Sequence, residues 1–414
     1  MNIQTTNTEK ATYHILKTAH EGFVTGVCMV SGGSLYVDYA ERILPGMLSS
    51  ALGLGTKDKT EEAVNDILES RGIELSFISS YEHLVINFKC LSKDIHTLVS
   101  LINEQIMTPR LDKDAFDNLK ARVITQYGAL KDDTSYQASA AFSQLLYPEK
   151  HISRSDKLED LMNVLKKTTR ADVAKYHKDQ VSLSHPKWII VGDVNEETII
   201  GICEKEIESV VKPLTPKREV LQSLPLKSQL KKIVVKDKQS VDLRMGHAIN
   251  IDMHHPDYLP LCLAIDALGG SFSARLMRTV RDEDGLTYNV GSQLDGFMPH
   301  HHGHWFVYAS FSPKLLDKGI ASIKKQLKIW HQGLSEEELN ERKQGMVGKY
   351  KVMLSDARAL ASRLASNIEK GYDVDYLYTF SDKVEAITLD QVNSAIKQYI
   401  DLNMIVCVYA GSIE

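Results

Sequence analysis

The chain contains two similar halves, and this internal repeat restricts its fold more than any other feature of its 414 residues. In the first half, Leu111–Asp114 opens a helical pattern that runs to Tyr127. Leu334–Glu337 opens the same pattern 223 residues later, and Tyr350 follows Tyr127 at the same offset. Each pattern continues into an acidic turn and then a helix rich in Ala and Ser. Repetition in the same order predicts two copies of one structural design.

A second pair of segments supports the repeat. Thr169 and Thr388 each precede a helical pattern with an acidic residue in its first turn, which is typical of a capped helix start. Each helix is followed by an apolar strand that ends in Gly, at Trp188–Gly192 and at Ile405–Gly411. The offset here is 219 residues, so the two halves differ only by a few residues of loop.

The apolar pattern predicts an α+β fold with a mainly antiparallel sheet in each half. Leu84–Cys90 is the clearest strand, because its apolar side chains alternate with polar ones and so leave one polar face. We expect helices to pack on one face of each sheet. Further strands are predicted at Lys232–Val235, Met245–Ile251 and His304–Phe311, and helices at Ala40–Leu52, Glu61–Ser70, Asp94–Gln105 and Leu315–Gly333.

Three prolines mark the join between the halves. Pro213, Pro216 and Pro225 lie in a segment without clear periodicity, and proline keeps such a segment extended. We therefore predict an N-terminal lobe at residues 1–211, a linker at 212–231 and a C-terminal lobe at 232–414.

Composition excludes several classes of function. A net charge of −5 gives no basic footprint for nucleic acid, and no apolar run is long enough to cross a bilayer. The polar start Met1–Lys10 has no signal-peptide pattern, so we expect a cytoplasmic protein, or a periplasmic one if a leader was removed. The five cysteines are scattered, which is not the pattern of a disulfide framework or a zinc knuckle.

Three segments carry a resemblance to a known family. They are Gly32–Phe77, Leu111–Asp133 and Leu268–Tyr288. The third is the most specific, because it resembles the pattern Leu-Gly-Gly…Ser-x-Arg-Leu…Arg-Glu-x-x-Gly-Leu-x-Tyr, with Asp282 where Glu is usual. Together they resemble the pitrilysin/insulinase metallopeptidases and the mitochondrial processing peptidases. The resemblance implies two homologous α/β lobes arranged as a clam shell.

The resemblance also implies where a zinc site would lie, but this chain lacks the residues that bind the metal there. Active members carry His-x-x-Glu-His on a helix of the first half, where the His side chains bind Zn²⁺ and the Glu is the general base. Those positions are held here by Gly46, Ser49 and Ser50. The family's third ligand falls at or next to Gln126. We therefore expect no family-type zinc site and no cofactor in this chain.

A second pair of family residues is retained. In the family, an Arg and a Tyr seven residues apart contact the substrate peptide and help hold the tetrahedral intermediate. Arg281 and Tyr288 match that pair. A guanidinium and a phenol can both donate to a carbonyl oxygen that is gaining negative charge.

The sequence thus predicts a non-catalytic, peptide-binding subunit that contributes Arg281 and Tyr288 to a zinc-bearing partner of the same family. Zinc is expected in that partner, and a homodimer without the partner is left open. Two alternatives stay open as well. One is a scaffold homologue with no role in proteolysis, and the other is a stand-alone peptidase with an unrelated metal site. The run His300–His304 invites that second alternative, although adjacent histidines on an extended chain point to opposite faces and suit a polar hairpin loop better.

Overall fold

The computed structural model describes residues 3–18, 22–206 and 214–413, and the chain divides into two compact units. Each unit is built from three stretches of sequence. The first comprises Met1–Thr125, Leu161–Glu219 and Lys351–Tyr378, and the second comprises Gln126–Asp160, Val220–Tyr350 and Thr379–Glu414. Four helices contain the points of division: α4 (Lys113–Ala129), α6 (Leu158–Lys167), α11 (Glu336–Met353) and α13 (Tyr376–Glu385).

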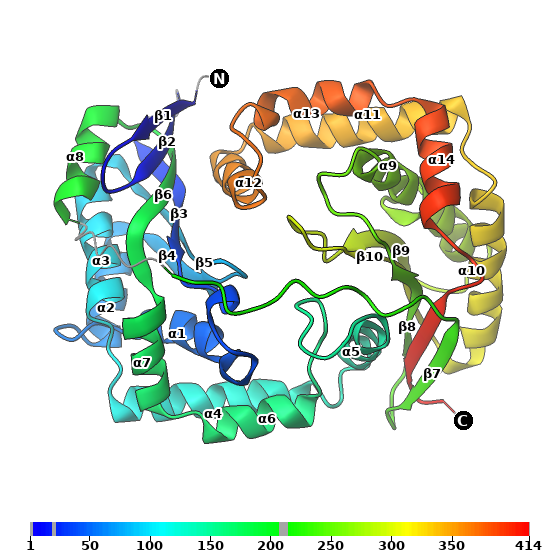
Figure 1. Ribbon diagram of the computed structural model, residues 1–414, viewed down its shortest axis with the longest axis horizontal. Coiled ribbons are helices and arrows are strands. Elements are labelled where there is room, and N and C mark those ends of the chain that lie inside the picture. Colours follow the sequence, from blue (N-terminus) through cyan, green and yellow to red (C-terminus); the bar gives the residue numbers. More distant parts are fainter. Residues whose placement is uncertain (1–2, 19–21, 207–213, 414) are drawn as a thin grey trace. The chain divides into compact units, whose positions relative to one another are not determined.

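The first unit is built on a six-stranded sheet (Figure 1). Only β2 and β6 run parallel among its neighbours, and every other pair is antiparallel. The strand order is β1 (Gln4–Asn7), β2 (Thr12–Lys17), β6 (Ser182–Gly192), β3 (Phe23–Ser31), β5 (His83–Leu91) and β4 (Glu74–Ser79). The helices from the first half of the chain are α1 (Leu44–Leu52), α2 (Glu61–Arg71), α3 (Ile95–Met107), α7 (Arg170–Gln180) and α8 (Glu196–Glu206).

The second unit repeats this design with five strands (Figure 1). Its order is β7 (Gln229–Val234), β11 (Val406–Gly411), β8 (Val241–Ala248), β10 (His304–Phe311) and β9 (Asn289–Asp295), and only β7 and β11 are parallel. Three of its helices are α9 (Tyr258–Gly269), α10 (Leu316–Trp330) and α14 (Leu389–Tyr399). The α+β class and the mainly antiparallel sheets predicted from sequence are confirmed.

Each unit takes one helix from the other half of the sequence. Helix α12 (Ala357–Glu369) packs Leu360 and Leu364 against Val27 and Ile189 in the core of the first unit. Helix α5 (Thr134–Leu146) packs Phe142 against Phe306 and Val408 in the core of the second unit. These are the two Ala/Ser-rich helices of the repeat. Their small side chains let a helix lie close to a sheet.

Most predicted elements are confirmed with small shifts at their ends. Thr169 and Thr388 form complete capping boxes, in which the Thr side chain and the third helical residue bond each other's backbone N–H. The strand predicted at Met245–Ile251 lies earlier in the chain than expected. Strand β8 spans Val241–Ala248, and its last residue, Ala248, pairs with His304 of β10. The boundaries at 212 and 231 stay a prediction, and residues 212 and 213 lie outside the described part.

Buried histidines make the second unit sensitive to acid. His304 accepts or donates a hydrogen bond with Tyr147 Oη (2.9 Å), and His151 stacks on the Tyr147 ring at 4.1 Å between centroids. Burial lowers the pKa of each histidine to about 4, and the neighbouring His301 adds to the effect on His151. The ordinary pKa is about 6.5, so in the unfolded chain these groups take up protons first as the pH falls.

We therefore predict that these two histidines add no pH dependence to the unfolding free energy of the second unit above about pH 7, and that they lower it as the pH falls from about 6 to 4. Each such histidine should contribute about 1.4 kcal/mol per pH unit in that window. Urea unfolding followed by tryptophan fluorescence would measure it in a Trp188→Phe background, which leaves Trp305 and Trp330 of the second unit, and His151→Phe, which keeps a ring against Tyr147, should flatten the slope. Equal slopes in both proteins would contradict the prediction.

Candidate functional site

The helix that resembles the family's metal helix carries no ligand in this chain. Gly46 and Ser50 are exposed on α1, and Ser49 is half-buried beside them. Both serine hydroxyls donate to the carbonyl oxygen of Gly46, at 3.0 Å from Ser49 and 2.9 Å from Ser50. The hydroxyls are thus satisfied by their own helix. A Cβ placed at Gly46 would meet nothing within 4 Å, so the surface above this turn is open.

The other expected metal positions give no site either. Gln126 is exposed on α4, in the part of that helix assigned to the second unit. Across residues 3–18, 22–206 and 214–413, no group of three or more His, Cys, Asp or Glu side chains is placed to hold a metal ion. The histidine run forms the turn between β9 and β10, where Met298 and His301 pair through both backbone N–H groups, as a hairpin loop requires.

Arg281 lies in a π-helical turn, Met277–Glu283, that interrupts the regular helix geometry. The wide turn is closed by the N–H of Asp284, which donates to the carbonyl of Thr279 at 2.8 Å. Gly285 ends it in the left-handed region (φ +63°), a conformation that suits glycine. Such π-helical turns often occur at functional positions, because they re-aim the side chains that they carry.

The structure places the guanidinium of Arg281 against two aromatic rings. Its Cζ lies 4.8 Å from the centroid of Tyr288 and 5.5 Å from that of Phe272. Both rings are exposed, at 84% for Tyr288 and 78% for Phe272. The Arg281 side chain is only 26% exposed, and its Nε lies 3.7 Å from Asp282 Oδ1. We call Phe272, Arg281 and Tyr288 the aromatic–Arg cluster.

The backbone around Tyr288 is fixed by its neighbours. Thr287 donates its hydroxyl proton to the carbonyl of Ser310 at the end of β10, which holds the chain where β9 begins. Gly269, at the end of α9, touches β9 so closely that a Cβ there would lie 2.4 Å from the Ser292 nitrogen. The Gly of the sequence motif therefore permits close packing of helix on strand.

The loop that carries Phe272 is held by a buried arginine. Arg342, on α11, is 6% exposed and donates to the hydroxyl oxygens of Ser271 (2.7 Å) and Ser273 (2.9 Å). Arg275 adds a bidentate ion pair with Glu338, at 2.7 and 2.6 Å. Because the residues on both sides of Phe272 are pinned, its exposed ring keeps a defined place.

The aromatic–Arg cluster presents two kinds of group to a ligand. The guanidinium of Arg281 offers N–H groups to a carbonyl or carboxylate oxygen, and the phenol of Tyr288 offers an O–H. The rings of Phe272 and Tyr288 offer apolar faces. The sequence predicts Arg281 and Tyr288 as site residues, but it gives no sign that Phe272 and Arg342 belong to the same arrangement. Phe272 lies inside the matched motif, but only the fold shows that its ring and the ring of Tyr288 contact the same guanidinium, that of Arg281.

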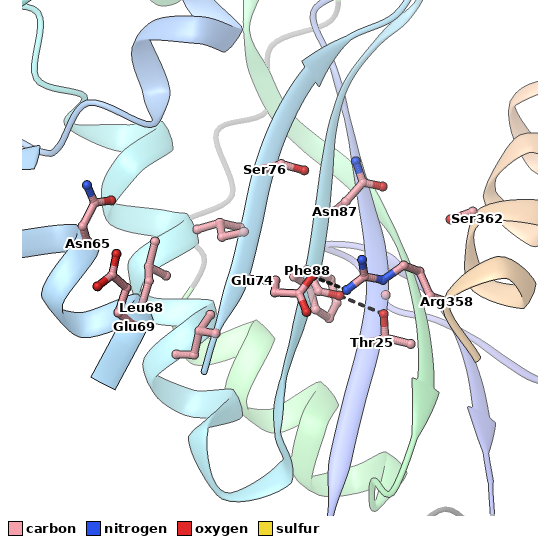
Figure 2. Close-up of a pocket in the computed structure, with 13 residues that line it drawn as sticks. Thr25, Asn65, Leu68, Glu69, Glu74, Ser76, Asn87, Phe88, Arg358 and Ser362 are labelled. Carbon is pink, nitrogen blue, oxygen red and sulfur yellow. Dashed lines mark hydrogen bonds and ion pairs between the residues drawn. The ribbon is translucent and has the colours of Figure 1, made fainter. Parts of the chain in front are cut away.

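A separate cavity of about 560 Å³ lies in the first unit, beside the edge strand β4 (Figure 2). Some of its charged and polar groups bond each other or the backbone. Figure 2 shows Glu74 and Arg358 paired with each other, and Thr25 donates to the carbonyl of Phe88 at 3.0 Å.

Comparison with known proteins identifies the family. Residues 24–168 match the model "Insulinase (Peptidase family M16)", and residues 167–346 match "Peptidase M16 inactive domain". The chain belongs to peptidase family M16, the insulinase family. This confirms the resemblance seen in the sequence. The matched region includes α1, the π-helical turn and both residues of the Arg281–Tyr288 pair.

Among similar proteins, one is named a non-peptidase homolog and another a zinc protease. The chain is 19% identical to "Non-peptidase homolog YmxG" of Helicobacter pylori over 90% of its length and 85% of that protein's. It is 22% identical to "Uncharacterized zinc protease MT2852" of Mycobacterium tuberculosis over 84% and 79%. A solved structure of a peptidase M16 inactive domain from Pseudomonas fluorescens shares the fold, with a TM-score of 0.85 and 20% identity over 99% and 98% of the two chains. In the described parts of the chain no helix has the length and apolarity to span a membrane.

Proteolysis can test whether Arg342 holds the loop that carries Phe272. Replacing Arg342 by Met removes two hydrogen bonds from a charged donor, each worth about 1.5–3 kcal/mol, so the loop should open more than tenfold more often. We predict faster chymotrypsin cleavage after Phe272, followed by mass spectrometry of the fragments. Lys343→Met, one residue further along α11, is the matched control. Equal cleavage of all three proteins would show that Arg342 does not hold the loop.

Proposed function

We propose that this chain is a non-catalytic subunit of a heteromeric metallopeptidase of family M16. It binds substrate peptide through Arg281 and Tyr288, while a zinc-bearing partner of the same family supplies the metal and the general base. The observation that carries the proposal is the placement of the Arg281 guanidinium 4.8 Å from the exposed Tyr288 ring.

The residues on α1 support the non-catalytic role. Gly46 offers no side-chain ligand, and the hydroxyls of Ser49 and Ser50 donate to the Gly46 carbonyl. The names met in the comparisons agree with a non-catalytic member of the family, since one similar protein is called a "non-peptidase homolog" and one matched family model describes an "inactive domain".

The geometry of the cluster supports peptide binding. Tyr288 stacks on the guanidinium and limits its motion, so that its N–H groups stay aimed when a carbonyl oxygen approaches. Two donors on one oxygen stabilise developing negative charge more than neutral charge, so both residues should act in the transition state as well as in binding. Phe272 covers the other side of the guanidinium at 5.5 Å and adds apolar contact area for a substrate side chain.

The test is reconstitution. The chain is purified alone and then mixed with a zinc-motif relative from the same source, and cleavage of a fluorogenic peptide is followed. We expect no cleavage by the chain alone and activity on mixing. Arg281→Ala should lower kcat/KM of the mixture by about 10²–10³, the usual cost of losing one such donor. Tyr288→Phe, which keeps the ring, should lower kcat more than it raises KM.

Arg278→Ala is the matched control, because Arg278 lies in the same π-helical turn but its side chain is 64% exposed and faces Glu283 at 4.0 Å. It should leave activity unchanged. If the mixture is active and Arg281→Ala behaves like this control while the two chains still associate, the chain is a scaffold and the proposal is wrong. Cleavage by the chain alone would also contradict it.

A further inference from the structure

Strand β7 ends the sheet of the second unit and has no neighbour on its outer side among the described residues. It pairs only with β11, in parallel, from Gln229 opposite Val406 to Val234 opposite Gly411. A row of backbone N–H and C=O groups therefore faces outward along β7. Proteins usually cover such an edge or use it to pair with another chain.

The first unit shows how the same edge is covered. Strand β2 corresponds to β7, because it also has six residues, also runs parallel to the Gly-ended strand, and also finishes opposite that Gly. The next residue makes the same bond in both units: Thr18 N–H donates to Gly192 O at 3.0 Å, and Val235 N–H donates to Gly411 O at 2.9 Å. In the first unit, β1 adds to β2 in antiparallel register.

Among residues 214–228, the described part of the chain directly before β7, no strand corresponds to β1. Leu224 instead donates its N–H to the carbonyl of Leu146, at the end of α5, and Pro225 follows directly. The four residues that would pair with a counterpart of β1 are Gln229–Lys232, by comparison with Thr12–Ile15. The duplication thus leaves a docking position for one strand vacant in the second unit.

Alternate residues of β7 direct their backbone N–H and C=O groups outward, away from β11. Gln229 and Val235 donate inward, to Ile405 O and Gly411 O. Because backbone groups alternate along a strand, Leu230, Lys232 and Val234 direct both N–H and C=O outward. The side chains of Leu230 and Val234 are 61% and 62% exposed, which is unusual for two large apolar residues on one strand face.

An apolar groove adjoins the same edge. It has a volume of about 490 Å³ and lies between β7, β11 and α10. Leu230, Ile320, Leu327 and Cys407 line it, and Lys324 and Lys328 stand among them on α10. A side chain of an added strand that faces the same way as Leu230 would enter this groove.

The charged residues around β7 indicate which kind of partner strand can bind at this edge. Five lysines lie between residues 226 and 238, with Asp237 as the only acidic residue there: Lys227, Lys231, Lys232, Lys236 and Lys238. Lys231 and Lys232 are exposed on β7 itself, on opposite faces. Two copies of β7 paired with each other would place lysines close together, and like charges across a ladder are unfavourable. A second copy of this chain is therefore disfavoured.

We propose that β7 is a docking site for an extended, acidic segment of a partner protein, which adds to the sheet as an antiparallel strand in the place that β1 takes on β2. On one face, carboxylates of the segment pair with Lys231, and on the other face its apolar side chains cover Leu230 and Val234. Such addition combines backbone hydrogen bonds for affinity with side-chain pockets for specificity.

The experiment uses the full chain and two fluorescein-labelled, N-acetylated decapeptides, one of alternating Glu and Val and one of alternating Lys and Val. Fluorescence anisotropy measures binding. The acidic peptide should bind more than tenfold more tightly than the basic one. Lys231→Glu/Lys232→Glu should reverse that preference, whereas Lys166→Glu/Lys167→Glu, the same charge change on α6, should not.

Amide hydrogen exchange, resolved by residue with NMR, provides the second readout. Binding of the acidic peptide should slow exchange at Leu230 and Lys232 at least tenfold and leave Lys231 and Ile233, whose N–H groups already face β11, nearly unchanged. If neither peptide binds, the lysines only keep the edge from pairing and the proposal is wrong. Binding that the β7 charge reversal does not alter, or without protection of the outward amides, would overturn it equally.

Discussion

The packing of one exchanged helix on each sheet supports the rest of this structure. In the first unit, Leu360 and Leu364 of α12 are at most 2% exposed because they lie on Val27 and Ile189. Burying one leucine side chain contributes about 2 kcal/mol, so these two contacts are comparable to a sizeable part of a domain's net stability. In the second unit, Phe142 of α5 packs against Phe306 in the same way. Neither sheet could stay folded with that face in water.

The same packing explains how the aromatic–Arg cluster can be exposed and still well ordered. Its residues project from short loops, but each loop is tied to a rigid element. Arg342 on α11 holds the serines around Phe272, and Thr287 is bonded to the end of β10. The π-helical turn aims Arg281 between the rings. Side chains held in this way would lose little conformational freedom on binding a ligand.

Much of this arrangement could be predicted from the sequence, because its causes are local. Capping threonines, alternating strands and the Arg281–Tyr288 spacing all depend on residues near one another in the chain. The helix exchange could not be predicted, since an Ala/Ser-rich helix suits either sheet equally well. Phe272 was missed for a similar reason: a large apolar residue in a loop is ordinarily assigned to the core, and only its position next to Arg281 shows otherwise. The open edge at β7 became visible only when both sheets could be compared strand by strand.

We propose that this chain contributes peptide-binding groups but no metal to the chemistry of its family. The zinc content of the purified full chain tests it most directly, measured by mass spectrometry after equilibration with excess zinc and dialysis. The account predicts far less than one zinc per chain, because Gly46, Ser49 and Ser50 stand where ligands and base would be needed. One tightly held zinc per chain would contradict it.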